Sequence, residues 1–413
     1  MSKQSRKIGS DVDELIISDL GVNKDTSSRK IPKFNFRGFN IKHLAIVVLI
    51  IIVLATIVFV FRFMNDDSAT FVWKVNLTKG SENVNNKSVE YTSFSNGLMR
   101  ISNDGITYVD GNGNVNWTIS YNVKDPIYVS NDKYFAIADR NDNNFYIFDE
   151  KGLTGENTTT NPIVKIALSE DGVLYVMQSD DNNSYINVFR SSGAVVDISI
   201  KTNITEDGMP IDISTSDSGE ELAVCYVCLT EDKIYTKATY YNFADAGKNA
   251  NSKRIVGEFV DEFNDRFLAR CHFFNDARSC LVSDDGIYYV STSDSANPKI
   301  TSLVDNNSRI SSISYNENYF AAIYDDKRLM VYDDKGATLC DRIIDIDYTN
   351  FYLSSDYIVF INNNRAVIYD IHGRILFDKE LASPIEYVAK RKSLIFTELL
   401  VGLIDGVECI RFY

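Results

Sequence analysis

The sequence has little of the residues that most often carry catalysis. Among its 413 residues are three His, six Cys and two Trp. It contains no Gly-rich phosphate loop, no HExxH helix and no nucleophile elbow. The formal net charge of -15 argues against a basic surface for nucleic acid, so we expect no nucleic-acid partner. With 45% apolar residues the chain is not a wholly disordered one, and its composition also excludes a collagen or a coiled coil.

The three His predict no catalytic centre. His43 borders a long apolar run, His272 lies in a strand-like segment and His372 lies in a turn. Single His residues in such places are more often structural or solvated than catalytic. We therefore expect a protein that is not an enzyme, with no catalytic, cofactor-binding or metal-binding residues and no cofactor.

The six Cys raise the question of disulfides. Cys225 and Cys228 are three residues apart in a strand-like run, which points their side chains to opposite faces and favours buried thiols over a redox or zinc pair. Cys340 and Cys409 resemble core residues.

Cys271 and Cys280 form the one candidate disulfide. If FFNDAR is a hairpin turn centred between residues 275 and 276, the two Cys face each other directly and a cross-strand bridge can form. An environment in which disulfides do not form would instead leave both as thiols.

Two acidic turns offer oxygen ligands at a spacing that suggests calcium. They are DRNDNN (139–144) and SDDNNS (179–184). Each lacks the full ligand set of a calcium loop, so we interpret both as solvated hairpin tips.

The strongest single feature is an apolar run from Leu44 to Phe61. Its 18 residues carry no charge, and only Thr56 is polar. At 1.5 Å per residue the run spans about 27 Å, close to the hydrocarbon core of a bilayer. We predict a transmembrane helix over residues 43–63, with the lipid bilayer as its partner.

The charges on either side of this run predict its orientation. Residues 1–42 hold nine basic and five acidic side chains, whereas Arg62 on the other side is soon followed by Asp66 and Asp67. The positive-inside rule then places a basic, disordered tail (1–42) in the cytoplasm. A short linker (64–70) leads to an extracellular domain (71–413), so the chain is predicted to be a single-pass protein of the cell membrane.

Beyond the linker one sequence motif recurs: a few strand residues, a polar turn and then Gly. Its copies are ITYVDGNG (106–113), FYIFDEKG (145–152), INVFRSSG (186–193), YYNFADAG (240–247), LMVYDDKG (329–336) and AVIYDIHG (366–373). IYYVSTSDS (287–295) and ECIRFY (408–413) are partial copies. The first three steps between final Gly residues are 39, 41 and 54, and the last is 37. A period near forty with short strands is typical of a β-propeller.

The eight copies of this motif predict an all-β fold, an eight-bladed β-propeller. One transmembrane α-helix is predicted to precede it. Seven blades and a large β-sandwich are the alternatives. The segment 248–253 (KNANSK) is predicted to be a loop insertion in the fourth blade. The chain stops just after the third strand of the last blade, so FVWKVNL (71–77) is predicted to complete that blade and close the ring. The only two Trp, Trp73 and Trp117, would then sit at matching places.

The segment YVDGNGNVNWTIS resembles the repeat of quinoprotein-type (PQQ-like) propellers. The whole layout is similar to a clostridial-type family of Gram-positive single-pass membrane proteins, which carry an outer PQQ-like propeller of unknown function. Only the first blade and FVWKVNL keep the Trp, so the resemblance implies a binding or assembly platform without a cofactor.

Three functional hypotheses follow. The first is a membrane-anchored, non-catalytic binding or scaffold module of the cell envelope, with a protein or glycan partner on one propeller face. The second is a transmembrane sensor that relays an outer binding event to the cytoplasmic tail. The third is an enzyme with a cofactor or metal in the central channel. We favour the first because it requires no group that the sequence does not supply.

Overall fold

The computed structural model divides into two compact units, residues 1–66 and 67–413, which are described separately. The residues it describes are 41–64, 69–77, 89–102, 105–121, 124–230, 232–263, 265–305, 308–393 and 396–412. The predictions for the tail up to residue 40 and for linker residues 65–68 lie outside them.

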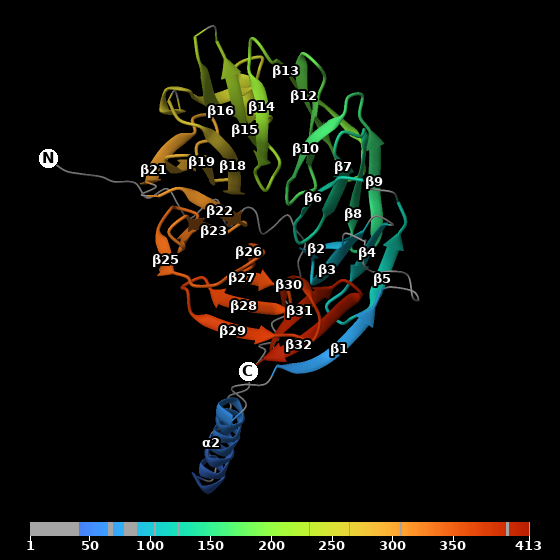
Figure 1. The fold of residues 1–413 in the computed structure, drawn as a ribbon, viewed down its shortest axis with the longest axis vertical. Helices are drawn as coiled ribbons and strands as arrows, with labels where there is room; N and C mark the ends of the chain where they lie inside the picture. Colours follow the sequence, from blue (N-terminus) through green and yellow to red (C-terminus); the bar gives the residue numbers. More distant parts are fainter. Residues whose placement is uncertain are drawn as a thin grey trace, which may run out of the picture. The chain divides into compact units, whose positions relative to one another are not determined.

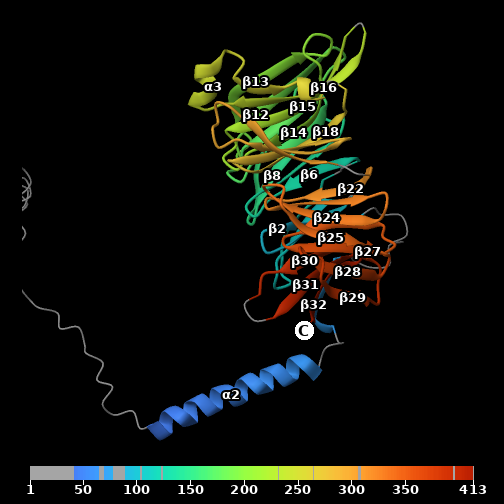
Figure 2. The same cartoon turned by 90° about the vertical axis from the view of Figure 1, so that its left-hand side faces the viewer.

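Within its described residues, 41–64, the first unit forms one helix, α2 (Ile41–Met64), which Figure 2 shows as a single continuous coil. Its side chains are described over residues 46–58, where every large apolar side chain is about half exposed or more. Counted over the described residues, no helix is long and apolar enough to cross a membrane. That finding lends no support to the span predicted for residues 43–63, which stays a prediction.

The second unit is a ring of eight four-stranded antiparallel sheets, which confirms the eight-bladed β-propeller and excludes the seven-bladed alternative (Figure 1). The first blade comprises β2 (Val89–Phe94), β3 (Gly97–Ser102), β4 (Gly105–Val109) and β5 (Val115–Ile119). The second comprises β6 (Pro126–Ser130), β7 (Phe135–Asp139), β8 (Asn144–Asp149) and β9 (Gly152–Thr158). The third comprises β10 (Ile163–Leu168), β11 (Leu174–Ser179), β12 (Asn183–Phe189) and β13 (Val195–Asn203).

The next three blades continue the same order around the ring. The fourth comprises β14 (Met209–Thr215), β15 (Glu221–Leu229), β16 (Ile234–Asn242) and β17 (Ile255–Phe259). The fifth comprises β18 (Leu268–Asn275), β19 (Arg278–Ser283), β20 (Gly286–Ser291) and β21 (Lys299–Asp305), after a short 3-10 turn η2 (Asp261–Phe263). The sixth comprises β22 (Ile310–Tyr315), β23 (Tyr319–Tyr324), β24 (Arg328–Asp333) and β25 (Thr338–Ile343).

The last two blades bring the ring back to its start. The seventh comprises β26 (Asn350–Ser354), β27 (Tyr357–Asn362), β28 (Arg365–Asp370) and β29 (Ile375–Glu380). The eighth comprises β30 (Ile385–Arg391), β31 (Thr397–Leu403), β32 (Gly406–Phe412) and β1 (Thr70–Asn76). β1 thus occupies the place predicted for the closing strand, and it pairs with β32 from Thr70 opposite Arg411 to Asn76 opposite Gly406.

Burial follows the position of a strand within its blade. Second strands such as β3 and β7 are buried on both faces and consist mostly of apolar residues. Fourth strands such as β13 and β21 alternate between exposed and less exposed side chains, because one face meets the solvent. The core is divided among the blade interfaces: eight apolar clusters are present in the described residues, one between each pair of neighbouring blades, including the eighth and the first.

The recurrent sequence motif forms the same turn in several blades. In the first blade Asp110 Oδ1 accepts the backbone N–H groups of Asn112 and Asn114, both at 2.9 Å. Asp333 and Asp370 accept the equivalent pairs in blades six and seven. Gly336 and Gly373 then take φ of 84° and 79°, the left-handed region that glycine adopts without a steric penalty. In these blades the predicted polar turn and Gly therefore form an Asp-x-x-Gly turn, which ends the third strand.

Blade four departs from this pattern. Gly247 lies within a six-residue helix, α3 (Asp245–Ala250), rather than in a hairpin turn. The helix lies between β16 and β17, so the predicted insertion is present but is partly helical instead of a plain loop (Figure 2). Asn242 Oδ1 accepts the N–H groups of Ala244 and Gly247, each at 3.0 Å, and these bonds start the helix where the other blades turn back.

Candidate functional site

Polar side chains from all eight blades surround one end of the central channel. In every blade the first strand lines the channel, and the turn between the first and second strands, the AB turn, lies at the same end. A cavity of about 530 Å³ opens there, and we call it the mouth. All eight blades contribute to its lining, one residue from each being Ser93, Asn131, Glu170, Asp217, Phe273, Glu317, Ser354 and Lys390.

At the mouth an ion pair joins neighbouring blades, between the half-buried Lys165 and the buried Asp212. Lys165 Nζ on β10 contacts the carboxylate of Asp212 on β14, which is 1% exposed. The other oxygen of Asp212 accepts the backbone N–H of Cys271 on β18 at 2.8 Å, so three blades are joined at this point. Bulges before Lys165 and Asp212 shift the register of both strands. Such bulges re-aim side chains, here into the channel wall. Desolvation lowers the pKa of Lys165. The contacts of Asp212 with Lys165 and with the Cys271 N–H make the pair a structural link between blades.

His272 also lies at the mouth, but it is held in place by its neighbours. Its Nε2 lies 2.9 Å from the carbonyl oxygen of Asn316, and its ring packs at 4.3 Å from that of Tyr315. Burial lowers the pKa of His272 to about 4, so the ring is neutral near pH 7 and Nε2 donates to the carbonyl. This is the structural role predicted for an isolated His.

Lysines and acids meet at the mouth in two groups. Three lysines are already paired with carboxylates: Lys390 with Asp356 at 2.8 Å, Lys392 with Asp132 at 2.7 Å, and Lys133 with Asp171 at 3.6 Å. Glu170, Asp217 and Glu317 have no basic partner among the described side chains. The mouth therefore carries an excess of negative charge on blades three, four and six.

Burial and the closeness of these acids to one another raise their pKa values. Burial raises the pKa of Glu170 to about 7, and the charges of Glu317 and Asp217 add to the effect. Burial and the charges of Asp132 and Asp217 raise the pKa of Glu317 as well. Carboxyl groups that hold protons near neutral pH respond strongly to a positive charge placed beside them.

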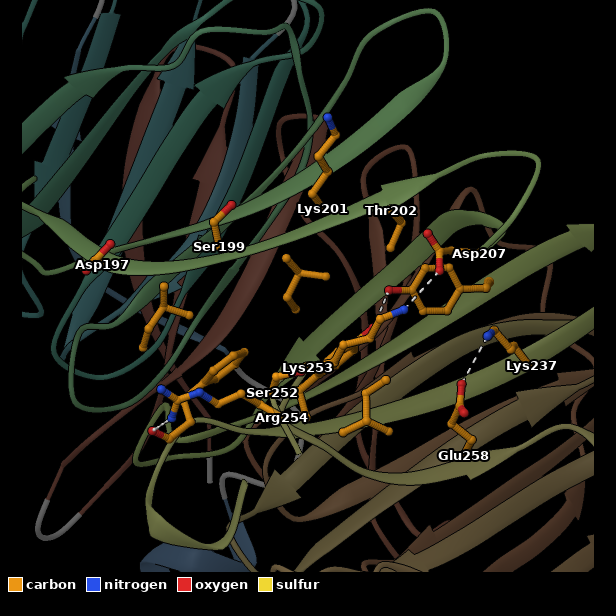
Figure 3. Close-up of a pocket in the computed structure, with 16 residues that line it drawn as sticks. Asp197, Ser199, Lys201, Thr202, Asp207, Lys237, Ser252, Lys253, Arg254 and Glu258 are labelled. Carbon is orange, nitrogen blue, oxygen red and sulfur yellow. Dashed lines mark hydrogen bonds and ion pairs between the residues drawn. The ribbon is translucent and has the colours of Figure 1, made fainter. Parts of the chain in front are cut away.

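A second hollow of about 450 Å³ lies between the outer strands of blades three and four (Figure 3). Its charged side chains are largely paired with one another: Lys237 with Glu258 at 3.1 Å and Lys253 with Asp207 at 3.5 Å. Behind them the hydroxyls of Tyr226 and Tyr241 share a hydrogen bond of 2.9 Å. Of the carboxylates in this lateral cleft, only Asp197 has no basic partner among the described side chains, against three at the mouth.

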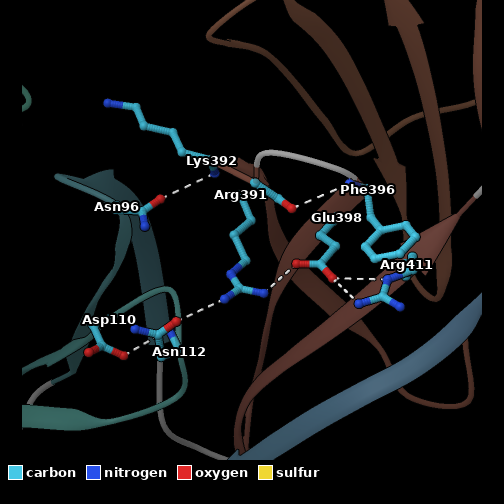
Figure 4. A network of polar contacts seen from close by, with 9 residues as sticks. Asn96, Asp110, Asn112, Arg391, Lys392, Phe396, Glu398 and Arg411 are labelled. Carbon is cyan, nitrogen blue, oxygen red and sulfur yellow. Dashed lines mark hydrogen bonds and ion pairs between the residues drawn. The ribbon is translucent and has the colours of Figure 1, made fainter. Parts of the chain in front are cut away.

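The eighth blade carries a buried network next to the closing strand (Figure 4). Glu398, whose side chain is 2% exposed, lies between Arg391 and Arg411, with Arg411 at 2.6 Å. Arg391 also donates to Asn112 Oδ1 of the first blade at 2.9 Å. The backbone N–H of Lys392 donates to Asn96 Oδ1 at 3.2 Å, so the network joins the last blade to the first.

The predicted Cys271–Cys280 bridge is contradicted by the strand register. Cys271 pairs with Leu281, and Cys280 pairs with His272, so the two thiols point to opposite faces of the fifth blade. Cys271 lies in the cluster shared with blade four, and Cys280 lies in the cluster shared with blade six. All six Cys are buried and free. Burial raises the pKa of Cys271, and the neighbouring thiol of Cys225 adds to the effect.

The remaining Cys lie as predicted. Cys225 and Cys228 belong to clusters on opposite faces of β15, one shared with blade five and the other with blade three. Cys340 and Cys409 are 4% and 0% exposed.

The two acidic turns use their oxygens to hold the backbone. Asp139 accepts the N–H groups of Lys124 and Asp125, and Asp180 accepts those of Asn182 and Asn183. Within the residues that the structure describes, no group of three or more His, Cys, Asp or Glu could hold a metal ion.

Comparison with known proteins places the chain in a family. The model of DUF5711, a family of unknown function, matches residues 72–412. The chain belongs to this family. No curated protein matches the chain in sequence.

Several solved structures are similar to this DUF5711 chain. Sqt1 of Saccharomyces cerevisiae superposes with a TM-score of 0.52 at 11% identity, over 83% of this chain and 99% of Sqt1. At that identity the likeness concerns the fold alone. BamB from Moraxella catarrhalis gives 0.46 at 12% identity, over 84% and 100% of the two chains. The Dos1 propeller gives 0.48 at 14% identity, over 83% and 95%.

Sequence reasoning did not find the acids of the mouth in this DUF5711 chain. Glu170, Asp217 and Glu317 belong to SEDG, SDSG and NENY, which read individually as ordinary polar turns. A signal was present, because each lies in the same turn of its repeat, between the first and second strands. Aligning the repeats on their third strands would have placed these acids together at one end of the ring.

Proposed function

We propose that this chain is a membrane-anchored, non-catalytic binding or scaffold module of the cell envelope, which holds a protein or glycan partner at the mouth of its propeller. The observation that carries this proposal is the mouth itself, because a single cavity of about 530 Å³ is lined by residues of all eight blades. Concave sites with a few convergent polar groups are the usual place for ligands on such rings. A partner seated there would contact every repeat at once.

Anchoring by residues 43–63 is part of the proposal. It is supported by the uncharged run from Leu44 to Phe61 and by the excess of basic residues before it. With this orientation the tail is cytoplasmic and the propeller is extracellular.

Introducing charge into the apolar run tests the anchor. Each Asp at the centre of a span costs about 3 kcal/mol, so Ile51→Asp combined with Leu54→Asp should release the protein from sedimented membranes. Protease added to intact cells should degrade the propeller of the unchanged protein. An unchanged membrane fraction in the double variant, or full protection from the protease, would contradict the anchor or its orientation.

A substitution that fills the mouth tests partner binding. Ser130 lies at the mouth and carries no charge, so Ser130→Trp narrows the cavity without altering the electrostatics. The matched control is Asn182→Trp, an exposed position in the turn between β11 and β12 at the other end of the ring. Partners crosslinked in native membranes should be lost from Ser130→Trp alone. Suppose that removal of residues 69–413 abolishes capture of the partners. If Ser130→Trp then still retains every partner, the mouth is excluded as the binding site.

A further inference from the structure

The AB-turn end of the propeller carries a band of carboxylates that extends outward from the mouth. Its members lie on blades three to six and have no basic partner among the side chains that the structure describes. We call them the acidic arc: Glu170, Asp217, Glu220, Glu221, Asp276 and Glu317. The other acids of this face, such as Asp132 and Asp356, are neutralised by lysines of the chain itself.

The arc is continuous from blade to blade. The backbone N–H of Ser218 donates to Asp276 Oδ1 at 2.9 Å, which joins the AB turns of blades four and five. The charge of Asp276 acts on both Asp217 and Glu221. On the other side the charges of Asp217 and Glu317 act on Glu170 across the mouth. The six carboxylates therefore form one electrostatic surface rather than six separate turn tips.

A cleft of about 800 Å³ opens at the outer end of the arc, beside the mouth. Glu220, Glu221 and Asp276 line it, together with the ring of Phe243 and the start of α3. Its one lysine, Lys248, is paired with Asp245 of the same helix at 3.3 Å. The cleft thus combines negative charge with an apolar wall, which suits the long methylene stem and charged end of a lysine or arginine.

Glu221 supplies a second and independent observation. Its residue is 7% exposed, and its Oε1 accepts the side-chain N–H of Asn242 at 3.3 Å. Its Oε2 is buried and has no hydrogen-bond partner in the structure. A buried carboxylate oxygen without a donor costs free energy, which an incoming N–H donor would recover. Burial, with the charges of Asp276 and Glu220, raises the pKa of Glu221 to about 7.

We propose that the acidic arc docks a lysine- or arginine-rich segment of a partner protein, with one cationic side chain seated at Glu221. The inference rests on the proposed function, because it names the class of partner for the same end of the propeller. A segment is favoured over a single metal ion because the carboxylates are spread along four blades and do not converge on one point. Charge complementarity of this kind steers association and fixes the register of the two partners.

Binding of a fluorescent ten-residue oligolysine peptide to the full-length protein in detergent micelles tests the proposal. The expected result is saturable binding that weakens as salt rises, whereas an oligoglutamate peptide does not bind. Glu221→Gln should weaken binding about tenfold, since it removes a charge-assisted hydrogen bond. Glu170→Gln, at the mouth end of the arc, should weaken it as well and does not depend on the burial of Glu221.

The matched control is Asp181→Asn. Asp181 is exposed in the β11–β12 turn at the other end of the ring. Binding is measured at pH 8, where Glu221 is mostly ionised, so that the two variants make the same change in net charge. Asp181→Asn should bind the peptide as the unchanged protein does. If Asp181→Asn and Glu221→Gln lose the same affinity for the peptide, binding depends only on the overall net charge of -15, and the proposal is overturned. Displacement of the peptide by micromolar calcium would also overturn it, in favour of a cation site.

Failure of this inference can be told from failure of the proposed function. If oligolysine does not bind but Ser130→Trp still loses its crosslinked partners, the mouth binds a partner that is not basic. If Ser130→Trp keeps those partners and the peptide does not bind, both proposals fall.

Discussion

At the scale of single residues, surroundings decide what a carboxylate does in this protein. Although desolvation acts to raise it, backbone N–H groups and the side chain of Arg374 lower the pKa of Asp370, which closes a turn. Glu221 has the opposite shift because it is buried with few donors. Glu398 represents a third case, since two guanidinium groups compensate its burial.

Removing the charge of Glu398 should destabilise the ring. Glu398→Gln leaves Arg391 and Arg411 close together without their shared anion, and breaking such a buried pair costs about 3 kcal/mol. The expected result is a lower urea midpoint for unfolding. Asp378→Asn is the control, because Asp378 forms a comparable bidentate contact with Arg365 that is exposed and worth less than about 1 kcal/mol. Equal losses in the two variants would contradict this role for burial.

At the scale of secondary-structure elements, the eighth blade is the decisive one. Its outer strand comes from the start of the described propeller and its other three strands come from the end. Trp73 on β1 lies opposite Cys409, and Trp117 on β5 lies opposite Tyr108. On each strand a register shift lies directly before the Trp. The two Trp are therefore equivalent, and β1 reproduces the fourth strand of an ordinary blade.

Crowding at Gly406 should loosen the closing strand. A Cβ at this position would lie 1.9 Å from the carbonyl oxygen of Val75, so Gly406→Ala must push β1 away from β32. Faster hydrogen exchange is expected in both strands. The matched control is Gly286→Ala in blade five, where the Cβ would lie 2.5 Å from Val304 O and should loosen β20 and β21. An increase in exchange spread evenly over all blades in either variant would argue against independent local effects.

The closing strand was predictable from sequence, whereas the pairing of Cys271 and Cys280 was not. Closure depends on a strand pattern that the chain end leaves incomplete, and such a pattern tolerates errors of a residue or two. The disulfide depends on register, and a slip of one residue turns every side chain to the other face. In blade five a bulge between Phe273 and Asn275 produces that slip.

The acidic arc escaped prediction for a different reason. Its members are far apart in the sequence and become neighbours only when the blades are arranged around an axis. Each acidic turn taken alone is well explained as a solvated hairpin tip. The sequence could not predict that Glu221 is buried or that its Oε2 has no hydrogen-bond partner. Both properties depend on Asn242 and on the α3 insertion.

At the scale of the whole molecule, the negative charge gathered at one end affects stability as well as binding. Burial raises the pKa of both Glu170 and Glu221 from 4.5 to about 7. The folded state therefore binds more protons than the unfolded chain between these values. The stabilisation from these groups is fully present below about pH 4.5 and is lost as the pH rises through about 7.

Glu221→Gln should accordingly stabilise the protein at pH 8 and not at pH 5. The neutral side chain avoids the cost of a buried charge, so we expect a gain of about 1–2 kcal/mol at the higher pH. Chemical unfolding at both pH values measures the difference. Asp181→Asn is the control and should give no gain in stability at either pH, because Asp181 is exposed and its charge is not buried. A gain of the same size at pH 5 would show that the carboxylate of Glu221 is not titrating in this range.

The pairing of β1 with β32 also sets an order on the assembly of the ring during synthesis. β1 is the first propeller strand to leave the ribosome and β32 is the last, at residues 70–76 and 406–412. At about 5–20 residues per second, β1 waits for tens of seconds without its partner. During that time the strands of the other seven blades become available in order, while β32, the strand with which β1 pairs, has not yet been synthesised. Closure by β1 therefore requires β32, and by then every strand of blades one to seven has been synthesised.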